Sequence, residues 1–416
     1  MVFEPGNLQV GETPIAFREG TERAVAPSAT LARVTPFLAM MGITRIAHLT
    51  GLDRLGIPVV SVCRPNSRSL SISQGKGLTM EAARVSGVME AIELYHAENV
   101  RAPLLLASYR EMRKRQRTVD HVGLPRLNTG HFNENLSILW VEGLDMIHGE
   151  PIMVPYDLVH TDFRTPLPTG SGAFFMSSNG LASGNCLAEA LSHALCEVVE
   201  RDANTLFSVS ARREQAARKV DLATVNDEAC RQVLDRFEDA GIAVVGWEST
   251  TDVGIASFLC TVVDRDRNSG RPMPPVSGSG THPRRGIALL RALTEAAQAR
   301  LTIISGARDD LSMRFFDDRA PLATAERDRL LGEAGGGARS FRDVPEFGED
   351  TFERNVKRMF QGLVDARFSR AVSINLTLPE FGIPVVRLIV PHLEAMSEVP
   401  GYVLGKRAKQ RLYGAT

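Results

Sequence analysis

The sequence predicts an α+β protein in which mixed sheets and helices form one large domain over residues 1–416. β-Branched runs and apolar helical segments alternate along the chain, but without the regular strand–helix–strand units of a parallel sheet. Two of the helices repeat each other at a fixed spacing, and no convincing linker divides the chain. We expect an N-terminal arm at residues 1–30 and a C-terminal helix and tail at residues 395–416.

Composition and charge exclude several classes of function. The 416 residues are 44% hydrophobic and 23% charged, as in ordinary globular proteins. The 48 Lys and Arg balance 49 Asp and Glu, so no strong field attracts nucleic acid or an anionic membrane. No apolar run is long enough for a transmembrane helix, and no signal peptide is recognisable. Five scattered cysteines without a CxxC pair indicate reduced thiols and a cytoplasmic protein.

The N-terminal part is predicted to contain a helix and two strands before a longer helix. We expect the first helix at 30–41. The β-branched run at 56–63 is typical of a strand, and the alternating run at 70–73 predicts a second, shorter strand. Residues 74–77 (QGKG) are expected to form a loop. Thr79 then suits the N-cap of the helix that follows.

The central stretch, residues 178–202, joins a Gly-rich approach (SNGLASGN) to an apolar helix that carries acids (CLAEALSHALCEVVERD). Because a helix turns about 100° per residue, Asn185, Glu189 and Glu200 fall on roughly one stripe. Glu197 lies about a quarter-turn to its side. Leu, Ala and Val surround these acids, and buried carboxylates are costly unless a cation meets them. The pattern therefore favours a cation site over a solvated acidic face.

The same design occurs earlier in the chain. Residues 77–93 overlay residues 184–200 at a constant offset of 107, which places Glu90 on Glu197 and Glu93 on Glu200. A weaker third echo is RALTEAAQ, which again sets polar residues in an apolar helix; it spans residues 291–298. Repetition of acids in this setting indicates an acidic cluster that gathers metal ions.

The region between the two acidic helices is predicted to be irregular and then sheet-like. Residues 98–130 are charged, and we interpret RKRQR at 113–117 as a solvated helix end rather than a nucleic-acid patch. Runs at 136–145 and 152–156 predict a hairpin of two strands. Pro155 indicates that the second strand lies at an edge.

The remaining elements follow the central helix in order. The approach at 169–178 is expected to be flexible, 270–285 to be a Pro/Gly/Ser loop, and 331–350, which has no periodicity, to be a mobile insertion. Helices are predicted at 220–241, 286–306 and 402–413, and strands at 243–248, 255–263, 371–378 and 385–390.

Several common catalytic and nucleotide-binding motifs are absent. Lys76 is followed by glycine, and Leu70 stands where a P-loop has its first glycine, so a P-loop is excluded. The glycines around 278–280 lack the spacing of a dinucleotide-binding fingerprint. The sequence contains no HExxH or GxSxG motif, and its nine histidines show no zinc-ligand spacing.

The chemistry that remains involves a hard cation. Carboxylate and amide oxygens suit Mg²⁺, and the predicted metal ligands are Glu90, Glu93, Glu189, Glu197 and Glu200, with Asn185 beside them. Mg²⁺ commonly accompanies phosphates, which Lys76, Arg201 and Arg291 are placed to clamp. The alternatives are a pairing of Arg201 with Asp202 or with a helix C-terminus, and a turn role for Lys76. Together the residues predict a nucleoside triphosphate held without a P-loop.

Three pieces of the chain resemble the YcaO family: QGKG before an ExxE helix, SNGLASGN before EALxxxLxEVVERD, and RALTEAAQAR. The resemblance runs from about residue 23 to residue 394 and implies a YcaO-type α+β fold. It also implies ATP and several Mg²⁺ ions bound by a carboxylate cluster. Members phosphorylate a peptide-backbone amide oxygen, and the product is an azoline, a thioamide or an amidine, depending on the nucleophile.

The resemblance also implies individual site residues. Its motifs place ATP and Mg²⁺ contacts on Arg23, Thr30, Glu90, Glu93, Asn185, Glu189, Glu197, Glu200, Arg201, Arg291 and Glu295. The residue pattern adds Lys76 as a further cofactor-binding residue. Arg201 and Arg291 are the expected catalytic residues, because their charge would stabilise the transferred phosphoryl group.

Two features indicate the branch of the family. ITRIAHLTGLDRLGIPV resembles the thioamide-forming branch, whose members work with a TfuA-type protein that supplies sulfide. Azoline-forming members commonly end in a PxPxP tail, whereas this chain ends KRAKQRLYGAT. We therefore expect a thioamide synthetase that acts on a precursor peptide or protein with a TfuA-like partner, as a homodimer. An azoline-forming cyclodehydratase, an accessory factor in ribosomal protein S12 methylthiolation and a ligase for small amino acids are the alternatives.

Overall fold

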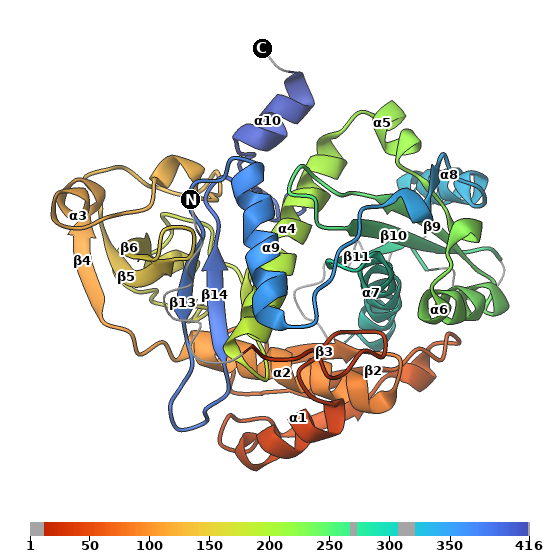
Figure 1. Ribbon diagram of the computed structural model, residues 1–416, viewed down its shortest axis with the longest axis horizontal. Coiled ribbons are helices and arrows are strands. Elements are labelled where there is room, and N and C mark those ends of the chain that lie inside the picture. The colour runs from red at the N-terminus through yellow and green to blue at the C-terminus, as the bar shows by residue number, and fades with distance from the viewer. Residues whose placement is uncertain (1–11, 267–272, 307–320, 415–416) are drawn as a thin grey trace.

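The computed structural model describes residues 12–266, 273–306 and 321–414 (Figure 1). Its helices are α1 (Pro27–Val34), α2 (Met80–Glu98), α3 (Tyr109–Arg115), α4 (Leu187–Val209), α5 (Arg212–Ala217), α6 (Glu228–Asp239), α7 (Arg285–Ser305), α8 (Pro321–Glu333), α9 (Phe352–Asp365) and α10 (Lys406–Tyr413). None of these helices is both long enough and apolar enough to cross a membrane.

The strands are almost all antiparallel. They are β1 (Arg45–His48), β2 (Val59–Cys63), β3 (Ile72–Lys76), β4 (Leu104–Ser108), β5 (Ser137–Asp145), β6 (Glu150–Pro155), β7 (Leu181–Ser183), β8 (Val220–Asp221), β9 (Ile242–Glu248), β10 (Ser257–Asp264), β11 (Val276–Thr281), β12 (Arg339–Ser340), β13 (Val372–Asn375) and β14 (Val385–Ile389). Two sheets have three strands each, β1-β2-β3 and β11-β10-β9. A six-stranded sheet has the order β4-β5-β13-β14-β7, with β6 paired to β5. This architecture confirms the predicted α+β class.

Three strand–helix units form the centre of the molecule. In each unit a helix packs on the strand before it: α2 on β3, α4 on β7 and α7 on β11. Each helix also contacts the strand of the next unit: α2 contacts β7, α4 contacts β11 and α7 contacts β3. The three units therefore form a closed ring. Helices α2 and α4 begin at Met80 and Leu187, which confirms the repeat at an offset of 107 residues. Figure 1 shows the six-stranded sheet on one side of α4 and the β9–β11 sheet on the other.

Glycines allow two of these helices to lie unusually close to their strands. A Cβ atom at Gly75 of β3 would lie 2.0 Å from the carbonyl oxygen of Ala83, and one at Gly280 of β11 would lie 2.1 Å from that of Ala288. Only glycine fits such an approach of two backbones. The predicted loops at 74–77 and 270–285 are therefore wrong in part, because both contain a strand whose glycines look like turn signals.

Other boundaries also differ from prediction. Residues 98–130 contain β4 and α3, and the predicted helix at 220–241 begins only at Glu228. The helix expected at 30–41 runs from Pro27 to Val34 and continues as a 3₁₀ turn. The mobile insertion predicted at 331–350 is wrong: Phe341 and Val344 there are fully buried against the β9–β11 core. The segment was not predicted to be ordered because its buried residues do not recur at the spacing of a helix or a strand.

Other expectations are confirmed. The Thr79 hydroxyl caps α2 by accepting a hydrogen bond from the Ala82 N–H at 3.1 Å. The hairpin of β5 and β6 is present. Among the named strands β6, with Pro155 at its end, pairs with β5, and its Met153 also forms an isolated parallel bridge with Thr118. RKRQR begins in the last turn of α3, as expected of a solvated helix end. The two C-terminal strands and the C-terminal helix are also present, although β13 ends at Asn375 and α10 begins only at Lys406.

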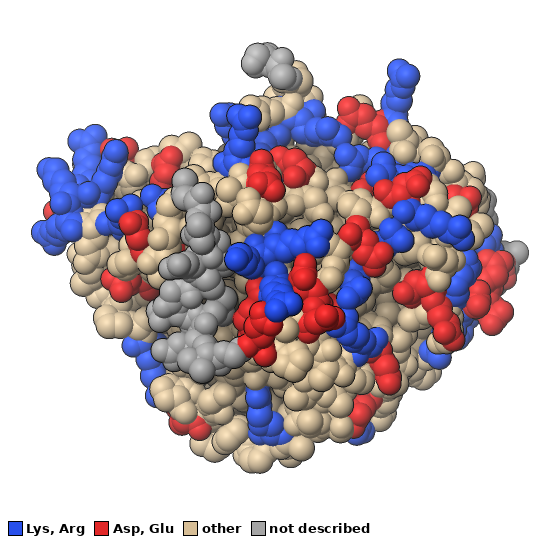
Figure 2. Space-filling model, in the orientation of Figure 1, with Lys and Arg blue, Asp and Glu red and all other residues tan. Residues whose placement is uncertain are grey.

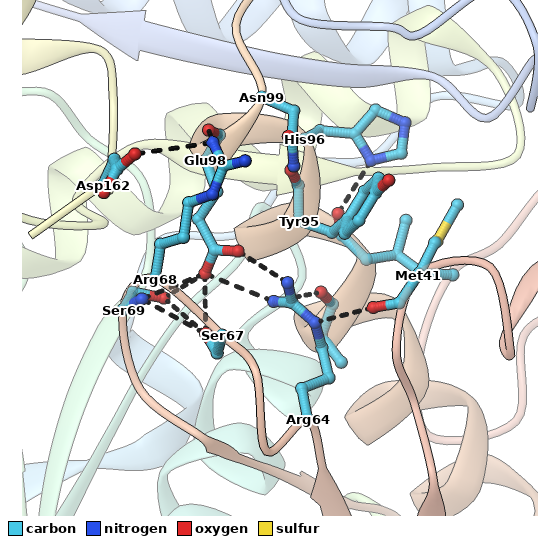
Figure 3. Close-up of polar contacts among 12 residues, drawn as sticks. Met41, Arg64, Ser67, Arg68, Ser69, Tyr95, His96, Glu98, Asn99 and Asp162 are labelled. Carbon is cyan, nitrogen blue, oxygen red and sulfur yellow. Dashed lines mark hydrogen bonds and ion pairs between the residues drawn. The ribbon is translucent and has the colours of Figure 1, made fainter. Parts of the chain in front are cut away.

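A buried ion pair fixes the end of α2, the helix that carries the first pair of acids (Figure 3). The Arg64 Nη2 lies 2.6 Å from the Glu98 Oε2, and both side chains are buried. The hydroxyls of Ser67 and Ser69 donate to Glu98 at 2.7 and 2.6 Å, and Arg64 Nε donates to the Met41 carbonyl oxygen at 3.1 Å. The connection between β2 and β3 is thereby tied to the C-terminus of α2.

Breaking this pair should destabilise the whole protein. Arg64→Ala leaves the Glu98 carboxylate buried without its cation, and we expect a loss of about 3–5 kcal/mol in the free energy of unfolding. The matched change Arg265→Ala removes an exposed pair with Glu238 and should cost less than about 1 kcal/mol. Urea denaturation of both variants measures this difference. Equal losses would show that the Arg64–Glu98 pair does not anchor α2.

Candidate functional site

A cavity of about 710 Å³ opens between α2, α4 and α7. Its walls include almost every site residue predicted from the sequence: Arg23, Thr30, Lys76, Glu90, Glu93, Asn185, Glu189, Glu197, Arg201, Arg291 and Glu295. The exception is Glu200, which is buried beside the cavity and does not line it. The fold thus gathers residues from the N-terminal arm and from all three strand–helix units at one place.

One corner of the cavity is a network between the N-terminal segment and the start of α4. The Thr30 hydroxyl donates to Asn185 Oδ1 at 2.9 Å, and Asn185 Nδ2 lies 3.2 Å from both carboxylate oxygens of Glu189. The Ala24 N–H also donates to Glu189 at 3.0 Å. The Arg23 Nε lies 3.6 Å from the same carboxylate. These contacts bring together the N-terminal and central residues that the sequence singled out.

A second corner joins β3, β11 and α7. The Lys76 ammonium lies 2.8 Å from Glu295 Oε2, and the Ser279 hydroxyl donates to Glu295 Oε1 at 3.3 Å. The same hydroxyl lies 3.0 Å from Glu200 Oε1. Burial alone raises the pKa of Glu295, but Lys76 and Arg201 outweigh it and lower that pKa to about 2. Glu295 is therefore an anion held between cations.

Two acids in the middle of the cavity have raised pKa values. Burial raises the pKa of Glu93 to about 8, even though the Ser183 N–H and hydroxyl both donate to its Oε1, at 2.8 and 2.7 Å. Burial likewise raises the pKa of Glu197 to about 7, with Glu200 adding to the rise and Arg201 opposing it. Carboxyl groups in this state gain most from a cation, because a cation favours their charged form.

Two arginines are only loosely held. The nearest carboxylate to Arg201 is Glu398 Oε1, at 4.0 Å from its Nη1, and the Nη2 of Arg291 lies 3.4 Å from the Nε2 of His193. The Nε atoms of both arginines are buried and have no hydrogen-bond partner among the described residues. Burial, with Arg291 nearby, holds the pKa of His193 well below its usual range, so this ring is neutral. Both guanidinium groups therefore keep an N–H that an incoming anion could accept from.

The donor set fits Mg²⁺ that arrives with phosphates. No three His, Cys, Asp or Glu side chains in the described ranges are arranged to hold a metal ion by themselves. Mg²⁺ is usually bound by one or two carboxylates together with substrate phosphates. The Glu200 Oε2 is buried without a hydrogen-bond partner among these residues, as are the two arginine Nε atoms. The unpaired carboxylate oxygen suits a cation, and the unpaired arginine nitrogens suit phosphate oxygens. The metal-binding role of the five acids stays a prediction.

Sequence reasoning missed three residues that shape the site. Ser183 of β7 bonds to Glu93 of α2, and Ser279 of β11 bonds to Glu200 of α4. Because Glu93 and Glu200 are equivalent in the repeat, the two serines play the same part for successive helices. His193, one turn from both Glu189 and Glu197, also lines the cavity. Its spacing of four from both acids was the signal that could have identified it.

The acids should make the ligand-free protein less stable as the pH rises. The usual glutamate pKa is 4.5, whereas those of Glu93 and Glu197 are about 8 and about 7 in the folded protein. The folded state therefore keeps protons that the unfolded state releases, and stability falls as the pH rises from about 4.5 to about 8.

Glu93→Gln should flatten this fall and raise the Tm at pH 8 in the absence of nucleotide. The control, Glu81→Gln on the exposed face of the same helix, should leave the pH profile unchanged. Thermal denaturation across this pH range makes the comparison. A wild-type profile in Glu93→Gln would contradict the assigned burial cost.

Comparison with known proteins shows the family to which the chain belongs. A family model described as "YcaO cyclodehydratase, ATP- and Mg²⁺-binding" matches residues 74–394. A Rhizobium leguminosarum bv. trifolii protein described as uncharacterized, in the tfuA 3′ region, is 37% identical over 398 residues, 95% of this chain and 94% of that protein. An uncharacterized protein of Methanothermobacter thermautotrophicus is 34% identical over 397 residues, 94% of this chain and 99% of its own. The chain belongs to the YcaO family, whose cofactors are ATP and Mg²⁺.

Solved structures confirm the YcaO type of fold. YcaO from Methanopyrus kandleri bound with AMPPCP and Mg²⁺ has a TM-score of 0.73 at 22% identity, and the match covers 95% of this chain and 99% of that one. A heterocyclase in complex with substrate and cofactor has a TM-score of 0.75, also at 22% identity. That match covers 94% of this chain but 55% of the heterocyclase, so this chain spans about half of its length.

Proposed function

We propose that the protein is an ATP- and Mg²⁺-dependent enzyme that activates a peptide-backbone amide by phosphorylating its oxygen, and that its product is a thioamide. The observation that carries this proposal is the cavity between α2, α4 and α7, where acids with raised pKa values face two loosely held arginines. Membership of an ATP- and Mg²⁺-binding family supports the same cofactors.

Each group in the cavity has a distinct part in this proposal. Glu90, Glu93, Glu189, Glu197 and Glu200 supply carboxylate oxygens for Mg²⁺, which in turn neutralises phosphate charge. Arg23, Thr30, Lys76, Asn185 and Glu295 bind and orient ATP. Arg201 and Arg291 stabilise the charge that develops on the transferred phosphoryl group, because a buried guanidinium acts strongly where water is excluded.

The thioamide branch is supported by the tfuA-region relative and by the state of the cysteines. Burial raises the pKa of Cys196 to about 12, and it also raises the pKa of Cys186, whose sulfur accepts the Glu189 N–H at 3.3 Å. Neither thiol in the central unit is therefore a ready nucleophile. Sulfur would instead arrive as sulfide from a TfuA-like partner, in a protein that we predict to be a cytoplasmic homodimer.

The reaction balances with sulfide as nucleophile. Hydrosulfide attacks the amide carbon, and the resulting oxyanion takes the terminal phosphoryl group of ATP, which releases ADP. Loss of inorganic phosphate together with the thiol proton then leaves a carbon–sulfur double bond. The chain's cations act on the phosphoryl group in both steps, first as it is transferred and then as it leaves.

The product mass tests the proposal. The protein is incubated with ATP, Mg²⁺, sodium sulfide and candidate precursor peptides, and with a TfuA-like protein where one is encoded nearby. We expect a gain equal to the mass difference between sulfur and oxygen, with one ADP and one phosphate per event. A peptide that loses the mass of one water in the absence of sulfide would reject the thioamide proposal in favour of an azoline product. A peptide that stays unmodified under all conditions would overturn the enzyme proposal. The accessory role would then be the remaining alternative.

A further inference from the structure

Strand β4 is an open and apolar edge of the six-stranded sheet. It pairs only with β5, and within the described ranges Leu104, Leu105 and Leu106 make no backbone hydrogen bond outside that pairing. Successive side chains of a strand point to opposite faces. These three leucines are nevertheless 37%, 43% and 55% exposed, so neither face of the strand is covered. Figure 1 shows β4 along the outer border of the molecule.

Such an edge normally carries some protection against pairing. Proteins place a charge, a proline within the strand or a bulge at an exposed edge, because unpaired backbone groups recruit other chains. Residues 102–109 contain no charged side chain, and Pro103 precedes the strand rather than interrupting it. The backbone groups and the leucines of β4 are thus both open to a partner strand.

A cationic helix follows this edge directly. Arg113, Lys114 and Arg115 at the end of α3 are exposed and form no ion pair with any residue that the structure describes. The one acid of α3, Glu111, bonds to Ser108 at the opposite end of the helix. Figure 2 shows the resulting concentration of positive charge at the upper left, over the position of α3 in Figure 1.

We propose that this β4–α3 surface, comprising Leu104–Leu106 and Arg113–Arg115, docks an extended acidic segment of a partner polypeptide. The segment adds to the open edge of β4 as a further strand, and its acids meet the cations of α3. Main-chain bonds give such a complex its geometry, while charge complementarity selects the partner.

Charge argues against a second copy of this chain as the occupant. Residues 101–117 carry six Arg or Lys and one acid, the capping Glu111. The cations at its two ends, Arg101 and Arg117, already pair with Glu380 and Glu150. A second β4–α3 surface would offer the α3 cations further cations and a single acid, Glu111, which already caps its own helix. This inference is independent of what binds in the cavity.

A designed peptide tests the surface. The probe is a short, fluorescein-labelled and end-capped peptide of alternating glutamate and valine, titrated with the full-length protein at low salt and followed by anisotropy. The control probe has lysine in place of each glutamate. The expected result is saturable binding of the glutamate probe, weakened by added salt, and no binding of the lysine probe. Hydrogen exchange at Leu104–Leu106 should slow when the glutamate probe binds.

Matched variants separate this surface from general attraction. The triple variant Arg113→Glu/Lys114→Glu/Arg115→Glu should bind the probe at least roughly tenfold more weakly. The control variant Arg212→Glu/Arg213→Glu/Lys409→Glu makes the same charge change on α5 and α10 and should retain binding. Circular dichroism and Tm establish that all variants are folded.

Four results would overturn the proposal: no binding of the glutamate probe, equal binding by the two triple variants, unchanged exchange in β4, or a wild-type dimer that dissociates in Leu104→Ser/Leu106→Ser. The last result would show that a second copy covers the edge. A Leu104→Ser/Leu106→Ser variant that keeps the wild-type oligomeric state and loses the probe would support the proposal.

Discussion

Replacing Arg291 with alanine is expected to lower the rate of ATP consumption, with peptide and nucleophile present, by roughly three orders of magnitude. Arg291 lines the cavity, its Nε has no hydrogen-bond partner among the described residues, and its Nη2 lies 3.4 Å from the Nε2 of the neutral His193. A cation held in this way costs little to reorganise when an anion arrives. Arg201→Ala should have a similar effect, because Arg201 also lines the cavity and its Nε has no hydrogen-bond partner among the described residues.

The kinetic pattern distinguishes catalysis from binding. If the arginines act on the transition state, kcat falls much more than KM rises in Arg201→Ala and Arg291→Ala. Arg291→Lys keeps the charge but loses the planar fork, and it should recover only part of the rate. The control Arg342→Ala removes an exposed arginine far along the chain and should be neutral. Near-normal ATP consumption in Arg291→Ala or Arg201→Ala would refute the assigned role.

The second large effect concerns the acids of α4. Glu197→Gln and Glu200→Gln should weaken the binding of Mg-ATP by more than the 10–100-fold typical of residues that only support a metal ligand. Neither change should unfold the protein, since each removes a carboxylate that is costly to bury; Glu200 is 3% exposed.

Calorimetry with Mg²⁺ and a non-hydrolysable ATP analogue measures this affinity. Glu81→Gln serves as the control, because Glu81 is exposed on α2. An affinity equal to that of the wild type in both Glu197→Gln and Glu200→Gln would remove these residues from the metal site.

Much of the site could be predicted from the sequence, because the repeat places its acids on one side of each helix. An acid three residues from another acid, set among Leu and Ala, predicts a side of a helix that must meet a cation. Two such helices at a constant offset predict that both meet it together. The structure brings Glu90, Glu93, Glu197 and Glu295 to one cavity, although they come from three helices far apart in the chain.

The parts that sequence reasoning missed depend on contacts between distant elements. Gly278 and Gly280 look like loop residues in the sequence, yet both lie in β11. Glycine is required there because a Cβ atom at either position would clash with the backbone of α7. Ser183 and Ser279 carry no local signal, since each serves an acid on another unit. Strand β4 was missed because its three leucines do not alternate with polar residues, as a half-buried strand would. In each case the determining partner lies elsewhere in the chain.

The measurement that tests the central claim most directly is the location of the metal in crystals grown with AMPPCP and Mn²⁺, a stand-in for Mg²⁺ that scatters anomalously. The account predicts anomalous peaks in the cavity between α2, α4 and α7, within coordination distance of acids from the set Glu90, Glu93, Glu189, Glu197 and Glu200, with the phosphates turned toward Arg201 and Arg291. Nucleotide and metal bound elsewhere, with this cavity holding only water, would contradict it.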